Sequence, residues 1–340
     1  MDRTIDDQSL GAELVAKIRD DFPGQPHTGR PIHTCGIGAE GFFQPSPVAR
    51  RYSNSPVFNT ARTNVAIRFS NGSGDHEEND NAADVHGMAV KLHVDEGVWD
   101  LVGMTLAEFF VRTPGQFIDF TEHAIPQPTK RVHWWDRWWA KLNLRLPPQQ
   151  PATPTSATDG LMNFANRHSY ARAGILGDAM LYRPVSWVRA QYHTIHVFGI
   201  TGPDGVRRRV RFRWDPVIGI RPAGDLDIGA DGLRTDLRAR LADAPASFQL
   251  RMTVAEAGDP IDDPTVGWPE WRHTVVMGTL WVTAIAADQE RDGEAISFNP
   301  ARLAPGIDPP LDHIFAARRA AYAVSCAERG GLGCPVKDAP

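Results

Sequence analysis

Alternation between apolar residues and arginines is the feature that most constrains the fold of this chain. Three apolar residues, Val210, Phe212 and Trp214, alternate with Arg209, Arg211 and Arg213. Because successive side chains of a strand point to opposite faces, this segment has one buried and one solvent-facing side. Four further segments are strand-like: Asn64–Ser70, Met88–Val94, Phe248–Val254 and Val275–Ile285. So many strands favour an antiparallel sheet, which can close into a barrel.

Helical spacing marks three other segments. Ser9 can cap a helix in which Leu10, Leu14, Ile18 and Phe22 recur every four residues. Leu233–Leu241 and Ile314–Tyr322 show the same spacing. The sequence GPDG then joins Ile195–Thr201 to the arginine-rich strand as a hairpin. We therefore expect an α+β protein, with residues 1–28 as an N-terminal helical arm and residues 29–340 as the core domain.

Charge and composition exclude several classes of function. A formal net charge of −5 gives no reason to expect a nucleic-acid partner. No long apolar run is present, so we expect no spanning helix and no integral membrane association. The acidic N-terminus lacks the apolar region of a signal peptide. The 3 cysteines suit a reducing compartment better than a disulfide framework, so we expect a cytoplasmic protein.

Two groups of polar residues near the N-terminus can carry chemistry. Arg30 and His33 lie in a glycine-rich segment, and glycines let a histidine approach a flat ligand closely. Arg68 and Ser70 share one face at a strand end, and arginine is the usual partner of a carboxylate. Taken singly, each has an ordinary alternative, namely a loop histidine and a surface arginine.

Two further groups include aromatic residues. Phe109 and Phe117 follow a glycine, and such phenylalanines are more often plain core. Arg318 and Tyr322 share a helix face, where a guanidinium favours the phenolate that can bind ferric iron. The ordinary alternative is a tyrosine packed on an arginine stem.

Seven motifs in order make the chain resemble the haem catalases. They are Arg30-x-x-His33-x-x-Gly36, AIRFSNGSGD, Asp84-x-x-Gly87-x-Ala89-Val90-Lys91, WDLVG, FFVRTPGQF, FNPARLAPGI and Arg318-x-x-x-Tyr322. The resemblance runs from about Gly29 to Tyr322 and is loose between about Glu122 and Ala190. It implies an antiparallel β-barrel with inserted helices, and haem b (iron protoporphyrin IX) buried beside it.

The resemblance also implies a role for each of these residues. Tyr322 resembles the axial ligand of the haem iron, with Arg318 keeping it anionic. His33 resembles the acid-base histidine on the opposite side, and Ser70 would bond it and fix its tautomer. Four more residues resemble haem contacts: Arg30 and Arg68 to the carboxylates, Phe109 beside the ring, and Phe117 lining the pocket and its entrance.

Two departures from the large catalases bear on the activity. After WDLVG they carry an asparagine that bonds peroxide, whereas this chain has Met104, which offers no donor. The chain also ends 18 residues after Tyr322, without the C-terminal helical domain of large catalases. In both respects it resembles the minimal branch, the catalase-related peroxidases. We therefore expect a haem peroxidase that reduces hydrogen peroxide or organic hydroperoxides with a small organic reductant, and has weak or no catalase activity.

Other functions remain open at this point. True catalase activity is one, and a haem sensor with little turnover, which Met104 would suit, is another. A hydroperoxide isomerase or dehydratase of the allene oxide synthase type shares the fold, but that branch carries threonine where this chain has Ile32. The Trp134–Trp139 segment forms either an interfacial anchor or entrance for lipid substrates, or it packs against the barrel or a second subunit. A homodimer is one assembly that the usual symmetry of soluble proteins allows, and NADPH binding is not expected without the helical domain.

Overall fold

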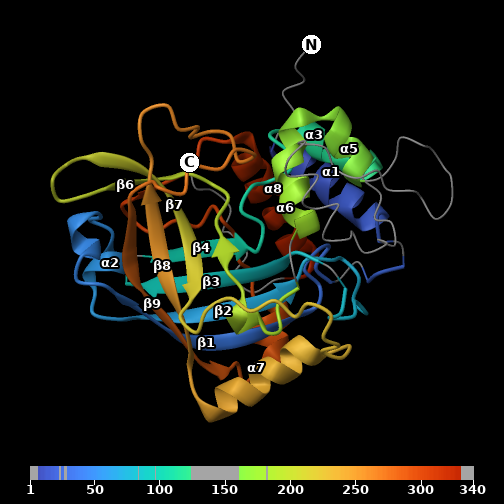
Figure 1. Ribbon diagram of the computed structural model, residues 1–340, viewed down its shortest axis with the longest axis horizontal. Coiled ribbons are helices and arrows are strands. Elements are labelled where there is room, and N and C mark those ends of the chain that lie inside the picture. Colours follow the sequence, from blue (N-terminus) through green and yellow to red (C-terminus); the bar gives the residue numbers. More distant parts are fainter. Residues whose placement is uncertain are drawn as a thin grey trace.

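Eight antiparallel strands close a barrel in the computed structural model (Figure 1), which describes residues 7–22, 24–26, 29–82, 84–95, 97–123, 161–180 and 183–330. In chain order they are β1 Gly36–Pro45, β2 Thr63–Asn71, β3 His86–Val94, β4 Gly97–Met104, β5 Tyr192–His193, β7 Arg207–Pro216, β8 Ala246–Val254 and β9 Thr274–Ile285. Pairing of β7 with β8 closes the ring. The short strands β6 Phe198–Thr201 and β10 Ile307–Asp308 extend it beside β7.

Large apolar side chains fill the inside of the barrel. The biggest fully buried ones are Phe43, Phe69, Trp99, Trp187, Tyr192, Phe212, Trp214 and Phe248. In β7 the three apolar residues of the alternation are buried and the three arginines between them are partly exposed, which confirms the predicted two-sided strand. An eight-stranded barrel is just wide enough to be filled by its own side chains. A large ligand therefore has to bind outside the barrel.

Most helices gather on one side of the barrel (Figure 1). This group comprises α1 Asp7–Asp20, α3 Pro114–His123, α5 Leu161–Arg167, α6 Arg172–Met180 and α8 His313–Glu328, while α7 Gly232–Asp243 lies apart from it, at the bottom of the view. The helices α1 and α8 pack closely, because a Cβ atom on Gly11 would lie 2.6 Å from the carbonyl oxygen of Ala320. The remaining helical segments of the described residues are α2 Pro56–Asn59, the three 3-10 turns Ala49–Arg51, Ser169–Ala171 and Trp187–Arg189, and the π-helix Glu290–Ala295.

The predicted hairpin, the strands and the three helices are confirmed within two or three residues at most ends. Strand β4, the helices α2, α3, α5 and α6, and the π-helix were not predicted. No disulfide was predicted, yet Cys326 is disulfide-bonded, while Cys35 is a buried free thiol. The Trp134–Trp139 segment lies outside the described residues. Among the described residues, no helix is long and apolar enough to cross a membrane.

Candidate active site

Two adjoining cavities lie between the outer face of the barrel and helices α1 and α8. Their volumes are about 110 Å³ and about 250 Å³. Both are lined by His33, Met104, Arg318 and Tyr322, which makes them parts of one site. The remaining predicted residues divide between them: Arg30, Arg68 and Ser70 line the smaller cavity, and Phe109 and Phe117 the larger. The fold therefore brings all the predicted site residues together.

A row of residues across three strands forms the floor beneath His33. Ser70 on β2 pairs with Gly87 on β3, and Gly87 pairs with Met104 on β4. Directly paired residues project from the same face of a sheet. The His33 ring takes the space over the glycine, since a Cβ atom on Gly87 would lie 3.0 Å from Nδ1. Gly87 therefore makes room for His33, and Met104 is the next side chain in the row.

The tautomer of His33 follows from its hydrogen bonds. Its Nδ1 lies 2.8 Å from the carbonyl oxygen of Asn71 and 3.1 Å from Oγ of Ser70. A carbonyl oxygen can only accept, so Nδ1 carries the proton and Nε2 is left as an acceptor. The sequence analysis predicted that Ser70 alone fixes the tautomer of His33. The carbonyl of Asn71 was missed because every residue has a backbone carbonyl, so the residue type does not reveal which one will accept a hydrogen bond.

Burial keeps His33 uncharged. Together with the positive charge of Arg68, burial lowers its pKa to about 3, although the Asn71 bond opposes the shift. The backbone of His33 has φ of 58°, a left-handed conformation that costs free energy for a residue other than glycine. The surrounding contacts hold the backbone of His33 in this conformation, as expected for a residue whose side chain needs a fixed orientation.

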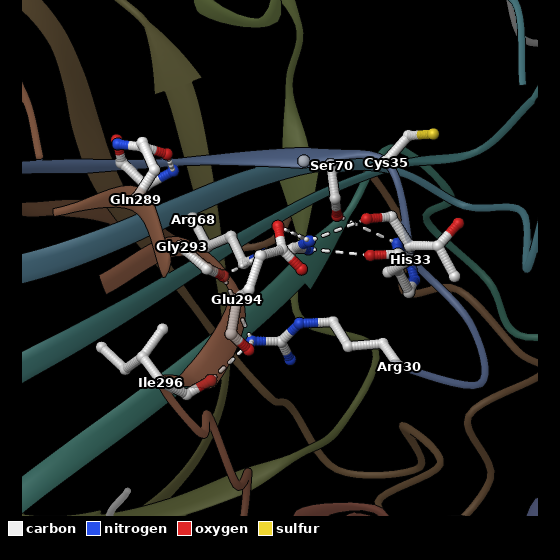
Figure 2. Close-up of polar contacts among 12 residues, drawn as sticks. Arg30, His33, Cys35, Arg68, Ser70, Gln289, Gly293, Glu294 and Ile296 are labelled. Atoms are coloured by element: carbon white, nitrogen blue, oxygen red, sulfur yellow. Dashed lines mark hydrogen bonds and ion pairs between the residues drawn. The ribbon is translucent and has the colours of Figure 1, made fainter. Parts of the chain in front are cut away.

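Arg68 supports the main chain around His33 (Figure 2). Its Nη1 donates to the carbonyl oxygen of His33 at 2.8 Å, and its Nη2 to that of Thr34 at 3.1 Å. Its Nε donates to Gly293 at 2.8 Å, and Nη2 also pairs with Glu294. Most of its donors are thus used within the protein, so its contact with a haem carboxylate stays a prediction.

Arginines form the polar end of the smaller cavity. Nη2 of Arg30 donates to carbonyl oxygens of the π-helix segment, the shortest bond being 2.5 Å to Ile296 (Figure 2). Its Nε is buried and has no hydrogen-bond partner among the described residues. Burial, followed by the charges of Arg68 and Arg329, lowers the pKa of Arg30. A buried cationic group with an unused donor is a site for an anionic ligand.

Arg329 lines the same end of the cavity, although the sequence analysis did not single it out. It is the C-cap residue of α8 and follows Tyr322 by seven residues, or about two helical turns, so it lies on the same side of the helix. Continuing the helix side shared by Arg318 and Tyr322 for two further turns would have identified it.

A buried chain of hydrogen bonds runs behind Tyr322. Nη2 of Arg318 donates to the tyrosine oxygen at 3.4 Å, and Nη1 to Nε2 of His196 at 2.9 Å. Since Nε2 accepts, Nδ1 of His196 carries a proton and donates to Asp312, also at 2.9 Å. Asp312 in turn caps α8 by accepting from the Phe315 amide at 2.8 Å. The cap of the helix and the orientation of Arg318 thus depend on one carboxylate.

Comparison with known proteins agrees with this geometry. The sequence profile of the catalase family matches residues 21–227, more than half of the chain. This protein belongs to the catalase family. A catalase-related peroxidase of Mycolicibacterium paratuberculosis is 29% identical over 324 residues, covering 94% of this chain and 95% of the relative. A catalase-related peroxidase of Synechococcus elongatus is 25% identical, covering 87% of this chain and 82% of the relative.

Solved catalase structures share the fold. A fungal catalase superposes with a TM-score of 0.70 over 92% of this chain, at 20% identity. Catalase A of Saccharomyces cerevisiae gives a TM-score of 0.68 over 94% of this chain, also at 20% identity. The present chain spans 61% and 64% of those two chains. The barrel and its helical cover are therefore the common catalase core.

Members of the catalase family bind haem, and the described residues fit that group. Tyr322 lines both cavities, and its hydroxyl is the hard oxygen donor that ferric iron takes in catalases. The unused Nε of Arg30 and the neighbouring Arg329 suit the haem carboxylates at the other end. Apolar residues, among them Phe109 and Phe117, line the larger cavity.

Proposed function

We propose that this catalase-family protein is a haem peroxidase that reduces hydroperoxides with a small organic donor and disproportionates hydrogen peroxide poorly. The observation that carries the proposal is the pairing of a neutral, aimed His33 with Met104 in the same cavity. The names of the two catalase-related peroxidases above support it. Haem, when bound, supplies the electrons that cleave the peroxide bond and recovers them from the donor.

His33 moves the proton in this scheme. Its unprotonated Nε2 accepts the proton of one peroxide oxygen and returns it to the other oxygen, which leaves as water or an alcohol. The depressed pKa of His33 keeps Nε2 free at neutral pH, and the Asn71 carbonyl holds the ring in the required tautomer. Acid-base assistance of this kind contributes about 10²–10⁴ in rate.

Met104 explains why a second hydrogen peroxide would be a poor reductant. Disproportionation needs the second molecule held beside His33, and a thioether offers no hydrogen-bond donor to do so. Loss of one such donor costs roughly a factor of 10²–10³ in comparable sites. An organic donor that delivers electrons one at a time has no such need.

The larger cavity favours organic hydroperoxides beside hydrogen peroxide. Its walls are mainly apolar, with Leu14 and Ile18 of α1 facing Phe109, Phe117 and Ile314. The same apolar lining supports a second candidate, an isomerase or dehydratase of lipid hydroperoxides. That reaction consumes the hydroperoxide without an added donor, so the two functions differ in stoichiometry.

Three measurements on the haem-loaded protein test the proposal. We expect guaiacol oxidation with both cumene hydroperoxide and hydrogen peroxide, and oxygen evolution from hydrogen peroxide at least about tenfold slower than guaiacol oxidation. Oxygen evolution as the main reaction would assign a true catalase. Conversion of a fatty-acid hydroperoxide to rearranged products without guaiacol would assign the isomerase.

A further inference from the structure

Met104 lies where the two cavities of the site meet. It lines both cavities and is partly exposed within them. On one side its side chain packs against an apolar cluster that contains Phe109 and Ile314. On the other side it neighbours Gly87 in the sheet, over which the His33 ring lies. The thioether is therefore held between an apolar wall and the acid-base histidine.

A thioether is a nucleophile toward peroxide oxygen. Its sulfur lone pair attacks one oxygen, the O–O bond breaks, and methionine sulfoxide forms while the other oxygen leaves as an alcohol or water. Sulfur is oxidised by two electrons and the peroxide bond is reduced by two. The proton of the attacked oxygen must reach the leaving oxygen, which is the transfer that Nε2 of His33 can perform.

We propose that Met104 is a modification site at which hydroperoxide is reduced by direct oxygen transfer to the methionine sulfur, with His33 relaying the proton. The inference deepens the proposed function, because it rests on hydroperoxide entering these cavities. The product places a sulfoxide oxygen, a strong hydrogen-bond acceptor, beside His33. An apolar wall of the site thus becomes polar in proportion to its exposure to hydroperoxide when the organic donor is scarce.

The chain carries its own reference methionines. Met252 and Met277 are fully buried in the barrel core and line neither cavity. Trypsin releases Met104 in the peptide of residues 92–112, which contains no other methionine, and Met252 and Met277 in separate peptides. Fragmentation of the 92–112 peptide separates oxidation of Met104 from oxidation of Trp99.

The test exposes the haem-loaded protein to one equivalent of cumene hydroperoxide without a donor and follows each peptide by mass spectrometry. We expect a gain of about 16 Da on Met104, at least about tenfold faster than on Met252 or Met277. In His33→Ala the Met104 rate should fall at least about tenfold. In Met104→Leu the gain on this residue should vanish while the two reference peptides behave as in the parent.

The outcomes separate this inference from the proposed function. Guaiacol turnover with Met104 unmodified overturns the inference and leaves the peroxidase standing. Selective Met104 oxidation without guaiacol turnover supports the inference and counts against the peroxidase. Oxidation of Met104 at the rate of the buried methionines, or at the parent rate in His33→Ala, overturns the inference.

Discussion

The Nδ1 atom of His33 lies 2.8 Å from the carbonyl oxygen of Asn71. This one contact fixes which nitrogen of the ring is free, because the carbonyl cannot donate. Asn71 ends β2, the strand that also carries Ser70 and Arg68, so the barrel itself sets the protonation pattern of the loop histidine. The acid-base chemistry of the site follows from that pairing.

Replacing His33 by glutamine removes the proton relay while keeping a polar side chain of similar reach. We expect peroxidase turnover to fall by about 10²–10⁴ with haem content unchanged. Stopped-flow decay of the Soret band after mixing with peroxide measures the step directly. An unaltered rate constant would remove His33 from the acid-base role.

Gly87→Ala tests the packing of His33 from below. The added methyl group would lie 2.9 Å from Oγ of Ser70 and 3.0 Å from Nδ1 of His33, so the ring must shift. Misplacement of about 1 Å can cost 10²-fold in rate, and we expect a loss of that order with little change in thermal stability. Gly115→Ala on α3 is the matched control, since nothing lies within 4 Å of its new Cβ atom. Equal activity of the two variants would show that the His33 ring can accommodate the added methyl group without losing its catalytic orientation.

Met104→Asn restores an amide beside His33. We expect oxygen evolution from hydrogen peroxide to rise by about 10-fold or more, because the amide can hold the second peroxide. An oxygen electrode measures it, and Met104→Leu, which adds no donor, should show no rise. If the Asn and Leu variants match, the amide is not the limiting feature of the site.

The raised pKa of Glu78 predicts that the free energy of unfolding depends on pH. Burial, followed by the neighbouring carboxylate Asp84, raises its pKa from 4.5 to about 9. Asp75 and Asp80 add smaller contributions of the same sign. The unfolded chain loses this proton above about pH 4.5 whereas the folded protein keeps it, so the stability from this group is lost as the pH rises toward 9.

Glu78→Gln abolishes that loss. We expect the melting temperature of the variant to exceed that of the parent by at least about 2 °C near pH 8, and the difference to vanish near pH 4.5. Differential scanning calorimetry at the two pH values measures it. The exposed neighbour variant Glu77→Gln serves as the control. A variant that is less stable at both pH values would contradict the assignment.

Sequence patterns predicted the barrel because each strand is locally two-sided. The alternation in β7 and the four-residue spacing in α8 are properties of single segments, and the structure reproduces both. Helix α3 was missed because its Pro114 and Gly115 suggest a turn, whereas proline is well tolerated in the first turn of a helix. The π-helix Glu290–Ala295 is stabilised by contacts with β1 and with Arg68, which no local pattern reveals.

The site residues likewise divide into those that a local sequence pattern predicts and those that only the folded structure brings together. Arg318 and Tyr322 are one turn apart, and Arg30 and His33 three residues apart, so spacing and family resemblance identified them. His196 and Asp312 are separated by 116 residues and meet only through the folding of the barrel against α8. A buried histidine between an arginine and an aspartate has no signature in the sequence.

The measurement that tests the central claim most directly is a haem titration of the parent and of Tyr322→Phe, followed by absorption spectroscopy. The parent should bind one haem per chain with a high-spin ferric spectrum, and addition of hydroperoxide should shift the Soret band, which guaiacol then restores. Tyr322→Phe should lose the parent spectrum and most of its haem affinity. A Tyr322→Phe variant with the affinity and spectrum of the parent would contradict the assignment of Tyr322 as the iron ligand, and a parent chain that binds no haem would contradict the proposed function as a whole.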